Sequence, residues 1–504
     1  MSQHSHRVAN NRRRFLINSA KTAGVLSVPL QFAACGSSPN DLLQPTQPGQ
    51  QVMPRGVHVS FIDDAATSRG LCWFTDGVED PGSFVEWAPL DASVPESEWQ
   101  DINLHPLHFR VEGVAEPTTG LDNLTHKVTV NNIDPQLAFR YRVGSEDGGW
   151  SPVYVVKPAP APGESWKFVH FGDVGNNHRS RRLVAEIQKP QHEHDLLLLA
   201  GDVSYADGQH ERWDNWFDTF EPYLANHVTM AVPGNHEAKD KDVQDDDYTT
   251  IPTYAFTNRF HQPGAVSFYG FDYNRVFVYA FTAGAFLEDG KLVQEMADME
   301  LALAQAAARR AAGEIDFIVV FQHYTIWTDQ AGRAPGNLSL ILVQEEILAR
   351  YGVDFLMCGH DHVYQRSTRM YKGQPDPTGL GYIQILTGCG GQSIRLFEPN
   401  IQSWSEKEFV GVGFSEYEVT NDTITARFYG SAPTDMDERE HIVHADLAAD
   451  FPLVDEFVIN KRPLALAKQF AQPARGAAEL LARYDWPRIE AQVRHRNNCP
   501  HAHA

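Results

Sequence analysis

Five short motifs of the sequence contain Asp, Asn, Tyr and His side chains, which are the types that bind metal ions. They are Gly172-Asp173-Val174-Gly175, Gly201-Asp202-Val203-Ser204-Tyr205, Gly234-Asn235-His236-Glu237, Gln322-His323 and Gly359-His360-Asp361-His362. Each motif comes directly after an apolar run. A single Asp or His in such a place is more often a cap or a buried structural group than a ligand. Five of them in succession predict loops that meet in one metal site.

The residue types indicate two different metal ions. Asp and Tyr oxygens are hard ligands that suit a trivalent iron, whereas an Asn oxygen and imidazole nitrogens suit a divalent ion. Two cations about 3.5 to 4 Å apart need a shared anionic ligand to offset their repulsion, and we assign that role to Asp202. The sequence thus predicts a centre with Fe3+ and one divalent metal, either Zn2+, Mn2+ or Fe2+.

The elements that must position these motifs alternate between strands and helices. Strands are predicted at residues 166–171, 195–200, 228–232, 315–321, 353–358 and 381–386. Helices are predicted where apolar residues recur on one face, at Leu292, Met296, Met299 and Leu303 and at Leu340, Val343, Ile347 and Leu348. This alternation is typical of an α/β domain. Because ligand sites in α/β folds gather at the carboxyl ends of strands, the five loops can converge.

The sequence before this α/β domain predicts a small all-β module. Residues 57–157 contain short alternating or β-branched runs separated by Gly, Pro, Asp and Asn, a pattern typical of a β-sandwich. We interpret the module as a structural spacer. The predicted divisions are a signal peptide at 1–35, a linker at 36–54, the β-sandwich at 55–157, the catalytic domain at 165–430 and a C-terminal extension without an assigned role at 431–504.

The five motifs, in this order, resemble those of the purple acid phosphatases within the calcineurin-like metallophosphoesterases. The likeness continues at Ala206-Asp207, at Arg212-Trp213-Asp214 and at Tyr364-Gln365-Arg366. The β-module resembles the fibronectin-like N-terminal domain of plant members, so the likeness covers roughly residues 57–430. The resemblance implies a four-layer αββα metallophosphoesterase sandwich preceded by a small fibronectin-III-like sandwich.

The resemblance also implies a role for each site residue. The ferric ion would be held by Asp173, Asp202, Tyr205 and His362, and the divalent ion by Asp202, Asn235, His323 and His360. His236 would lie beside the substrate, next to the metal-binding Asn235, and would bind phosphate or donate a proton. We therefore predict His236 as the catalytic residue, with Asn235 and His236 contacting the substrate.

Two departures from related sequences bear on this assignment. Most of the wider superfamily begins with Asp-x-His, whereas here Gly175 stands two residues after Asp173. The resemblance implies that Tyr205 takes the place of the missing ligand. Plant members also carry an additional histidine pair after the fourth motif, where this chain reads Tyr324-Thr325-Ile326-Trp327-Thr328-Asp329. The substrate pocket must therefore be built differently. His178 is a candidate contributor, although we expect it to be a surface histidine.

These features predict a hydrolase of phosphoric ester bonds, namely an acid phosphatase acting on phosphate monoesters. Two cations totalling about +5 face about −3 of ligand charge, which leaves about +2 to bind hydroxide and phosphate. A hydroxide held by the metals would attack phosphorus in line, and His236 would protonate the leaving alkoxide. Two alternatives fit the same residues: a phosphodiesterase or nucleotidase, and a surface binding protein with an inert phosphatase domain.

Residues 1–35 are predicted to be a twin-arginine signal peptide. The run Arg12-Arg13-Arg14-Phe15-Leu16 precedes an apolar stretch, 23–34, that is too short to span a bilayer. Phe32-Ala33-Ala34-Cys35 resembles a lipoprotein cleavage box, so Cys35 is a candidate lipid anchor, whereas cleavage after Ala34 would leave no anchor. We expect export to the periplasm, to the medium or to a lipid-anchored place at the cell surface.

The remaining composition limits the partners. The 504 residues carry a formal net charge of −23, which argues against a surface for nucleic acid. Small phosphate esters can still bind, because surface charges beyond about 8 Å are largely screened at physiological salt. The five cysteines are too scattered to predict a disulfide framework. Cys499, His501 and His503 are expected to lie in a frayed tail. The sequence predicts no oligomeric state.

Overall fold

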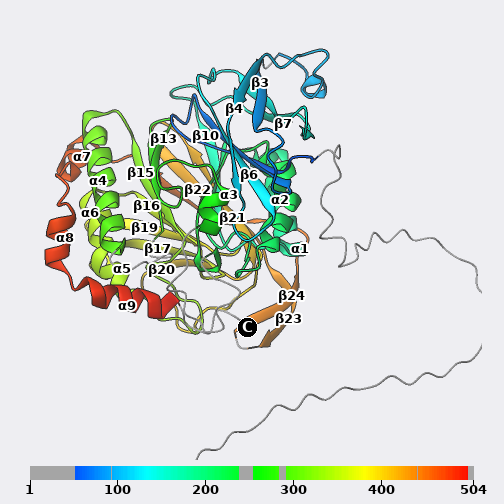
Figure 1. Ribbon diagram of the computed structural model, residues 1–504. Helices are drawn as coiled ribbons and strands as arrows, with labels where there is room; N and C mark the ends of the chain where they lie inside the picture. The colour runs from blue at the N-terminus through cyan, green and yellow to red at the C-terminus, as the bar shows by residue number, and fades with distance from the viewer. Residues whose placement is uncertain (1–51, 92, 238–253, 283–290, 440, 498–504) are drawn as a thin grey trace, which may run out of the picture. The chain divides into compact units, whose positions relative to one another are not determined.

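The computed structural model describes residues 52–91, 93–237, 254–282, 291–439 and 441–497 (Figure 1). The predicted signal peptide, with Arg12, Arg13 and Cys35, lies outside the described residues, as do Cys499, His501 and His503. Among the described helices, none has the length and apolar character needed to cross a membrane.

The first part of the described chain is the predicted all-β module, built from two antiparallel sheets. One sheet has the order β1 (Arg55–Ser60), β2 (Arg69–Asp76), β6 (Asn123–Val130) and β5 (Val114–Pro117). The other contains β4 (Phe109–Glu112), β3 (Phe84–Leu90), β7 (Ala138–Ser145), β8 (Gly149–Trp150) and β9 (Tyr154–Val156), with a short helix η2 (Glu96–Glu98). Strand β1 contacts the next domain, where Arg55 forms an ion pair with Asp214 at 2.6 Å.

The second part of the chain contains two large mixed sheets. The six-stranded sheet has the order β12 (Thr229–Val232), β11 (Leu196–Ala200), β10 (Trp166–Phe171), β21 (Val412–Val419), β22 (Thr423–Ser431) and β25 (Leu453–Asn460). The eight-stranded sheet contains β13 (Tyr269–Tyr273), β14 (Val276–Phe281), β15 (Phe317–Gln322), β16 (Phe355–Cys358), β19 (Tyr382–Thr387), β17 (Tyr364–Tyr371), β18 (Gln374–Pro375) and β20 (Ser405–Phe409). All six strands expected from the sequence are present.

The central strands are buried on both faces, because each sheet packs against the other sheet and against helices. Leu196 and Leu198 of β11 belong to the core between the sheets, which also contains Val319 of β15. Leu197 of β11 and Val320 of β15, which point the other way, belong to the core that includes the helices. This alternation gives the predicted αββα order of layers, and the predicted fold class is confirmed.

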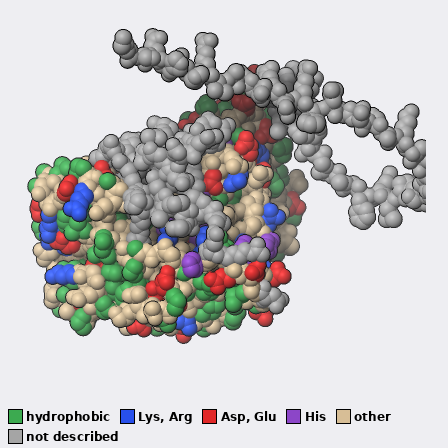
Figure 2. Space-filling view, turned by 90° about the horizontal axis from the view of Figure 1, so that it is seen from below, with side chains coloured by type: hydrophobic (Ala, Val, Ile, Leu, Met, Phe, Trp, Pro, Cys, Tyr) green, Lys and Arg blue, Asp and Glu red, His purple; other side chains and the backbone are tan. Residues whose placement is uncertain are grey.

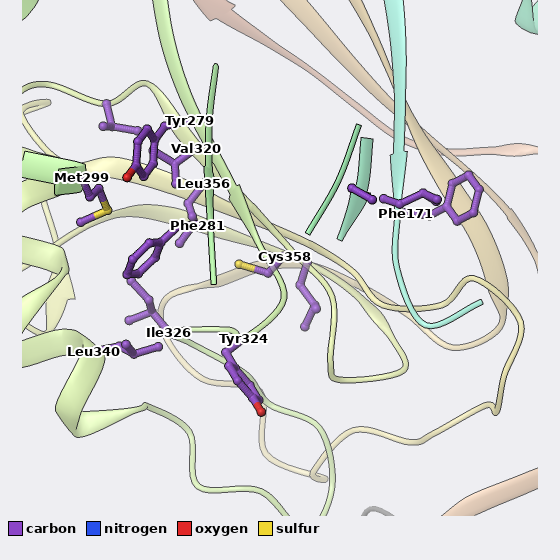
Figure 3. Packing of buried hydrophobic residues seen from close by; sticks show 14 of the residues in the cluster. Phe171, Tyr279, Phe281, Met299, Val320, Tyr324, Ile326, Leu340, Leu356 and Cys358 are labelled. Atoms are coloured by element: carbon purple, nitrogen blue, oxygen red, sulfur yellow. The ribbon is translucent and has the colours of Figure 1, made fainter. Parts of the chain in front are cut away.

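Helices cover the outer faces of the sheets (Figure 1). They are α1 (His178–Ile187), η3 (Pro190–His192), α2 (Glu211–Leu224), α3 (Tyr254–Arg259), α4 (Lys291–Ala312), α5 (Leu338–Val343) and α6 (Glu345–Arg350). Figure 3 shows Met299 of α4 and Leu340 of α5 in the same cluster as Phe281, Val320 and Leu356 of the sheet. Full burial of one such side chain contributes roughly 1.5 to 3 kcal/mol to stability.

The segment after residue 430 packs on the catalytic domain. Strand β25 pairs with β22, and after the hairpin β23 (Pro433–Arg439) and β24 (Ile442–Leu447) the chain ends in helices that contact α4. These helices are α7 (Leu464–Phe470), α8 (Ala477–Arg483) and α9 (Trp486–Asn497). Buried Arg462 lies 2.9 Å from Asp354, which also pairs with Arg310 at 3.2 Å. The segment thus contributes an edge strand and part of the helical cover.

Candidate metal centre and active site

The five motifs lie at the carboxyl ends of strands from both sheets. Asp173 follows β10, Asp202 and Tyr205 follow β11, Asn235 and His236 lie in η4 (Asn235–Glu237) after β12, His323 follows β15, and His360 and His362 follow β16. Each of these side chains belongs to a residue that is at most 9% exposed. The structure therefore brings together all the site residues expected from the sequence.

Three donor atoms form a first group. The Tyr205 hydroxyl lies 3.1 Å from Asp173 Oδ1 and 2.9 Å from His362 Nε2. His362 Nε2 lies 3.2 Å from the same carboxylate oxygen. Ligand atoms bound at about 2.1 Å to one ion are separated by about 3 Å, so this spacing fits a shared metal ion.

Four donor atoms form a second group. His323 Nε2 lies 3.3 Å from Asp202 Oδ2 and 3.1 Å from Asn235 Oδ1. His360 Nδ1 lies 3.1 Å from the same amide oxygen and 3.2 Å from His323 Nε2. Asp202, His323 and His360 each offer one ligand atom, and these three atoms lie within 4.8 Å of one another. These residues can therefore hold a metal ion.

Burial makes this cluster of polar groups electrostatically costly. It raises the pKa of Asp173 and raises that of Tyr205 well above its ordinary value. Burial also acts to raise the pKa of Asp202, but the charges of His323 and His236 outweigh it and lower that pKa. For His323 burial acts in the opposite direction, yet Asp202 raises its pKa to about 9. Bound cations would favour the ionised carboxylates and the phenolate, so the donor set fits metal ions.

The protein holds the remaining ring nitrogen in two of these histidines, His323 and His362. His323 Nδ1 donates to the Ala200 carbonyl oxygen at 2.8 Å, which leaves Nε2 as the donor atom facing the second group. His362 Nδ1 is hydrogen-bonded to the Ser393 hydroxyl. Such contacts fix the tautomer and the orientation of a metal-binding imidazole.

Glu237 joins the loops that carry the second group. Its Oε1 accepts from Val203 N at 2.9 Å, and its Oε2 accepts from Gly234 N at 2.7 Å. Burial raises the pKa of Glu237 to about 7. The sequence contained Glu237 within the third motif but indicated no role for it. The structure shows that it holds the loops after β11 and β12 together.

His236 lies beside the donor atoms without entering either group. Its Nδ1 lies 2.6 Å from Asp207 Oδ1, and its ring packs at a tilt of 40° against the ring of Tyr205, with centroids 4.2 Å apart. Since a carboxylate only accepts, Nδ1 carries a proton and Nε2 faces Asp202 Oδ2 at 3.8 Å. Asp207 is thus a positioning residue, which the sequence indicated only as a part of the Ala206-Asp207 likeness.

Several loop residues adopt backbone angles that are rare outside glycine. Asp173, Asp202, Tyr205 and His360 have φ values of 61°, 48°, 53° and 73°. Such left-handed conformations are costly and tend to occur at functional sites. The adjacent loops also approach closely, since a Cβ at Gly234 would lie 2.1 Å from Asp202 Oδ1.

A small pocket opens over the donor atoms. It is lined by Asp202, Asn235, His236, Gln330, Arg333, His360, His362 and Arg395. Figure 2 shows one face of the molecule, on which histidine side chains reach the surface among acidic ones. His178 is exposed at the start of α1 and does not line this pocket. Gln330, Arg333 and Arg395 had no sequence signal, because they lie outside the five motifs.

Two family models match this chain. Residues 167–364 match the calcineurin-like phosphoesterases, and residues 54–157 match the purple acid phosphatase N-terminal domain. The chain combines these two domains. The predicted family resemblance is therefore confirmed, and so is the prediction that the protein is a phosphoric ester hydrolase.

The chain is similar to purple acid phosphatases from plants in sequence and in fold. It is 22% identical to purple acid phosphatase 18 of Arabidopsis thaliana, over 89% of this chain and 98% of the relative. It is 25% identical to Fe(3+)-Zn(2+) purple acid phosphatase 12 of the same plant, over 73% of this chain and 79% of the relative. The solved structure of purple acid phosphatase PPD1 from yellow lupin seeds aligns with a TM-score of 0.64 at 17% identity, covering 84% of this chain and 76% of that one. That structural likeness supports the fold.

The second group of donor atoms predicts zinc-dependent stability. For metal-free protein, Zn2+ at about 100 times its dissociation constant should stabilise the fold by about 2.7 kcal/mol. His323→Ala should lose most of that increment, whereas the surface variant His178→Ala should keep it. The measurement is thermal unfolding with and without Zn2+. An unchanged increment in His323→Ala would place the metal elsewhere.

Proposed function

We propose that the protein is an exported acid phosphatase that hydrolyses phosphate monoesters at an Fe3+ and divalent metal centre. The observation that carries the proposal is the arrangement of seven donor residues in two adjacent groups beside His236. The phenol of Tyr205 belongs to the first group, with Asp173 and His362, and supports iron there. The relative named Fe(3+)-Zn(2+) purple acid phosphatase 12 supports zinc as the divalent ion.

Asp202, His236 and Asn235 would each have a different role in the reaction. Bound cations would act as Lewis acids on the phosphate and on water. Asp202 belongs to the second group through Oδ2, while its Oδ1 accepts from His236 N at 2.8 Å. His236 would act in its doubly protonated form, in which Nδ1–H donates to Asp207 and Nε2–H gives its proton to the leaving alkoxide. Asn235, through its amide beside the pocket, would contact the substrate phosphate.

An inert phosphatase domain that serves only for binding is the less favoured function. Loss of catalysis would leave no reason to keep every donor residue. Here all seven donor residues lie together with His236 and its partner Asp207.

Tyr205→Phe provides the test of the iron site. Oxidised, iron-replete protein should be coloured, because a phenolate bound to Fe3+ gives a visible charge-transfer band. The variant keeps the ring and removes the oxygen, so it should lose the band and retain iron weakly. Visible absorption with iron analysis is the measurement, and Tyr371→Phe is the matched control that keeps the colour. A colourless wild type, or a variant with the same band, would exclude iron ligation by Tyr205.

His236→Ala provides the test of the proton donor. Turnover of a phosphate monoester should fall by roughly a hundredfold or more, with both metals still bound, because His236 acts on the substrate. Steady-state kinetics and metal analysis of the same sample measure both quantities, with His178→Ala as the control. Loss of a metal from the variant would make His236 a ligand, and unchanged turnover would remove it from the mechanism.

Export by the twin-arginine route is proposed from Arg12 and Arg13, with delivery to the periplasm, the medium or, through Cys35, a lipid-anchored place. This route carries folded proteins, so metals could be inserted before export. Replacing both arginines by lysine should trap phosphatase activity inside the cell. Fractionation of cells that express each form is the measurement. Normal export of the double variant would contradict the proposal.

A further inference from the structure

Two arginines line the pocket over the donor atoms, although neither belongs to the five motifs. Arg333 lies on the chain between β15 and α5, and Arg395 lies between β19 and β20. Gln330 lines the pocket beside them. These residues add positive charge to a site whose protein donors are mainly anionic or neutral.

Arg333 is held in place by a buried carboxylate. Its Nε lies 3.1 Å from Asp361 Oδ1, and the Asp361 side chain is fully buried. Asp361 also accepts from Thr325 Oγ1 at 3.3 Å and from Gln330 Nε2 at 3.5 Å. Asp361 stands between His360 and His362 in the fifth motif, so this ion pair fixes Arg333 relative to both groups of donor atoms. The charge of Arg333 is largely offset by Asp361.

Arg395 is buried near a carboxylate that is already paired, because the charge of Asp361 acts on Arg395 as well as on Arg333. It is only 7% exposed, and its backbone N donates to the His362 carbonyl oxygen at 3.4 Å. Burial and the charge of Arg333 lower the pKa of Arg395, yet a guanidinium stays protonated. Tyr205 and Asp361 act to raise this pKa, but among the described residues the carboxylate of Asp361 forms its ion pair with Arg333 and not with Arg395. Two buried guanidinium groups that share one carboxylate leave an excess of positive charge, which is costly, and an anionic ligand in the pocket would offset that cost.

We propose that Arg395, positioned next to Arg333, binds a terminal oxygen of the substrate phosphate and makes the site selective for monoesters. The inference rests on the proposed function, whose reaction it narrows to one substrate class. A monoester dianion has three terminal oxygens, so one can contact a guanidinium while the others face the metal-binding groups. A diester has two terminal oxygens and one charge, and its second ester group would have to occupy the place beside Arg395.

The experiment uses metal-loaded protein and the variants Arg395→Gln and Arg395→Lys. Calorimetry measures the affinity for inorganic phosphate, and kinetics measure kcat/KM for 4-nitrophenyl phosphate and for bis(4-nitrophenyl) phosphate. Arg395→Gln should weaken phosphate binding about 10- to 100-fold and lower the monoester-to-diester ratio of kcat/KM by a similar factor. Arg395→Lys, which keeps the charge but lacks the fork of donors, should show smaller losses of both quantities.

The matched control is Arg309→Ala. Arg309 is an exposed arginine of α4 that pairs with Asp272 of β13 at 2.8 Å, so its loss removes the same charge outside the pocket. It should leave phosphate affinity and the ester ratio unchanged. If Arg395→Gln does not fold, Arg395→Lys carries the test through its weaker phosphate binding.

The outcomes separate this inference from the proposed function. A wild type that prefers the diester, or an Arg395 variant with unchanged phosphate affinity or an unchanged ester ratio, would overturn the inference. A wild type that hydrolyses neither ester would overturn the proposed function, and the phosphate affinities would still decide whether Arg395 binds an oxyanion.

Discussion

The structure depends on the burial of two carboxylates, Asp173 and Asp202, in a single cluster of polar side chains. Removing such groups from water costs several kcal/mol each unless counter-charge and hydrogen bonds compensate. His362 and the backbone N of His360 contact Asp173, while His323 and the backbone N of His236 contact Asp202. Burial of these carboxylates would also make the binding of cations strongly favourable. The burial that destabilises the fold therefore suits the site to metal binding.

The rest of the fold supplies the rigidity that this cluster needs. Strands from two sheets end at the same place, and their loops are fixed by left-handed backbone at four of the donor residues. Glu237 fastens two of these loops, and Asp207 and Ser393 hold the outer nitrogens of His236 and His362. Because these contacts hold the side chains in place before a metal or substrate binds, little conformational entropy is lost on binding. Side chains without such contacts would be too mobile for catalysis.

The sequence predicted the strands and the convergence of the motif residues, because both leave strong local signals. Apolar runs of strand length marked β10, β11 and β15, and a metal-binding side chain followed each of them. Arg395 could not be predicted in this way, since its place over the site arises from the path of the chain between β19 and β20. The edge strand β25 was also missed, because only Asp455 and Ile459 of its residues are buried and its pairing with β22 is set by tertiary packing.

The central claim is that the two groups of donor residues hold two different metals. Anomalous X-ray diffraction from crystals of the metal-loaded protein, recorded at the iron and zinc absorption edges, tests it most directly. The account predicts two peaks about 3.5 to 4 Å apart, with iron bound by Tyr205 and the divalent ion by His323. A single peak, or iron at the group without Tyr205, would contradict it.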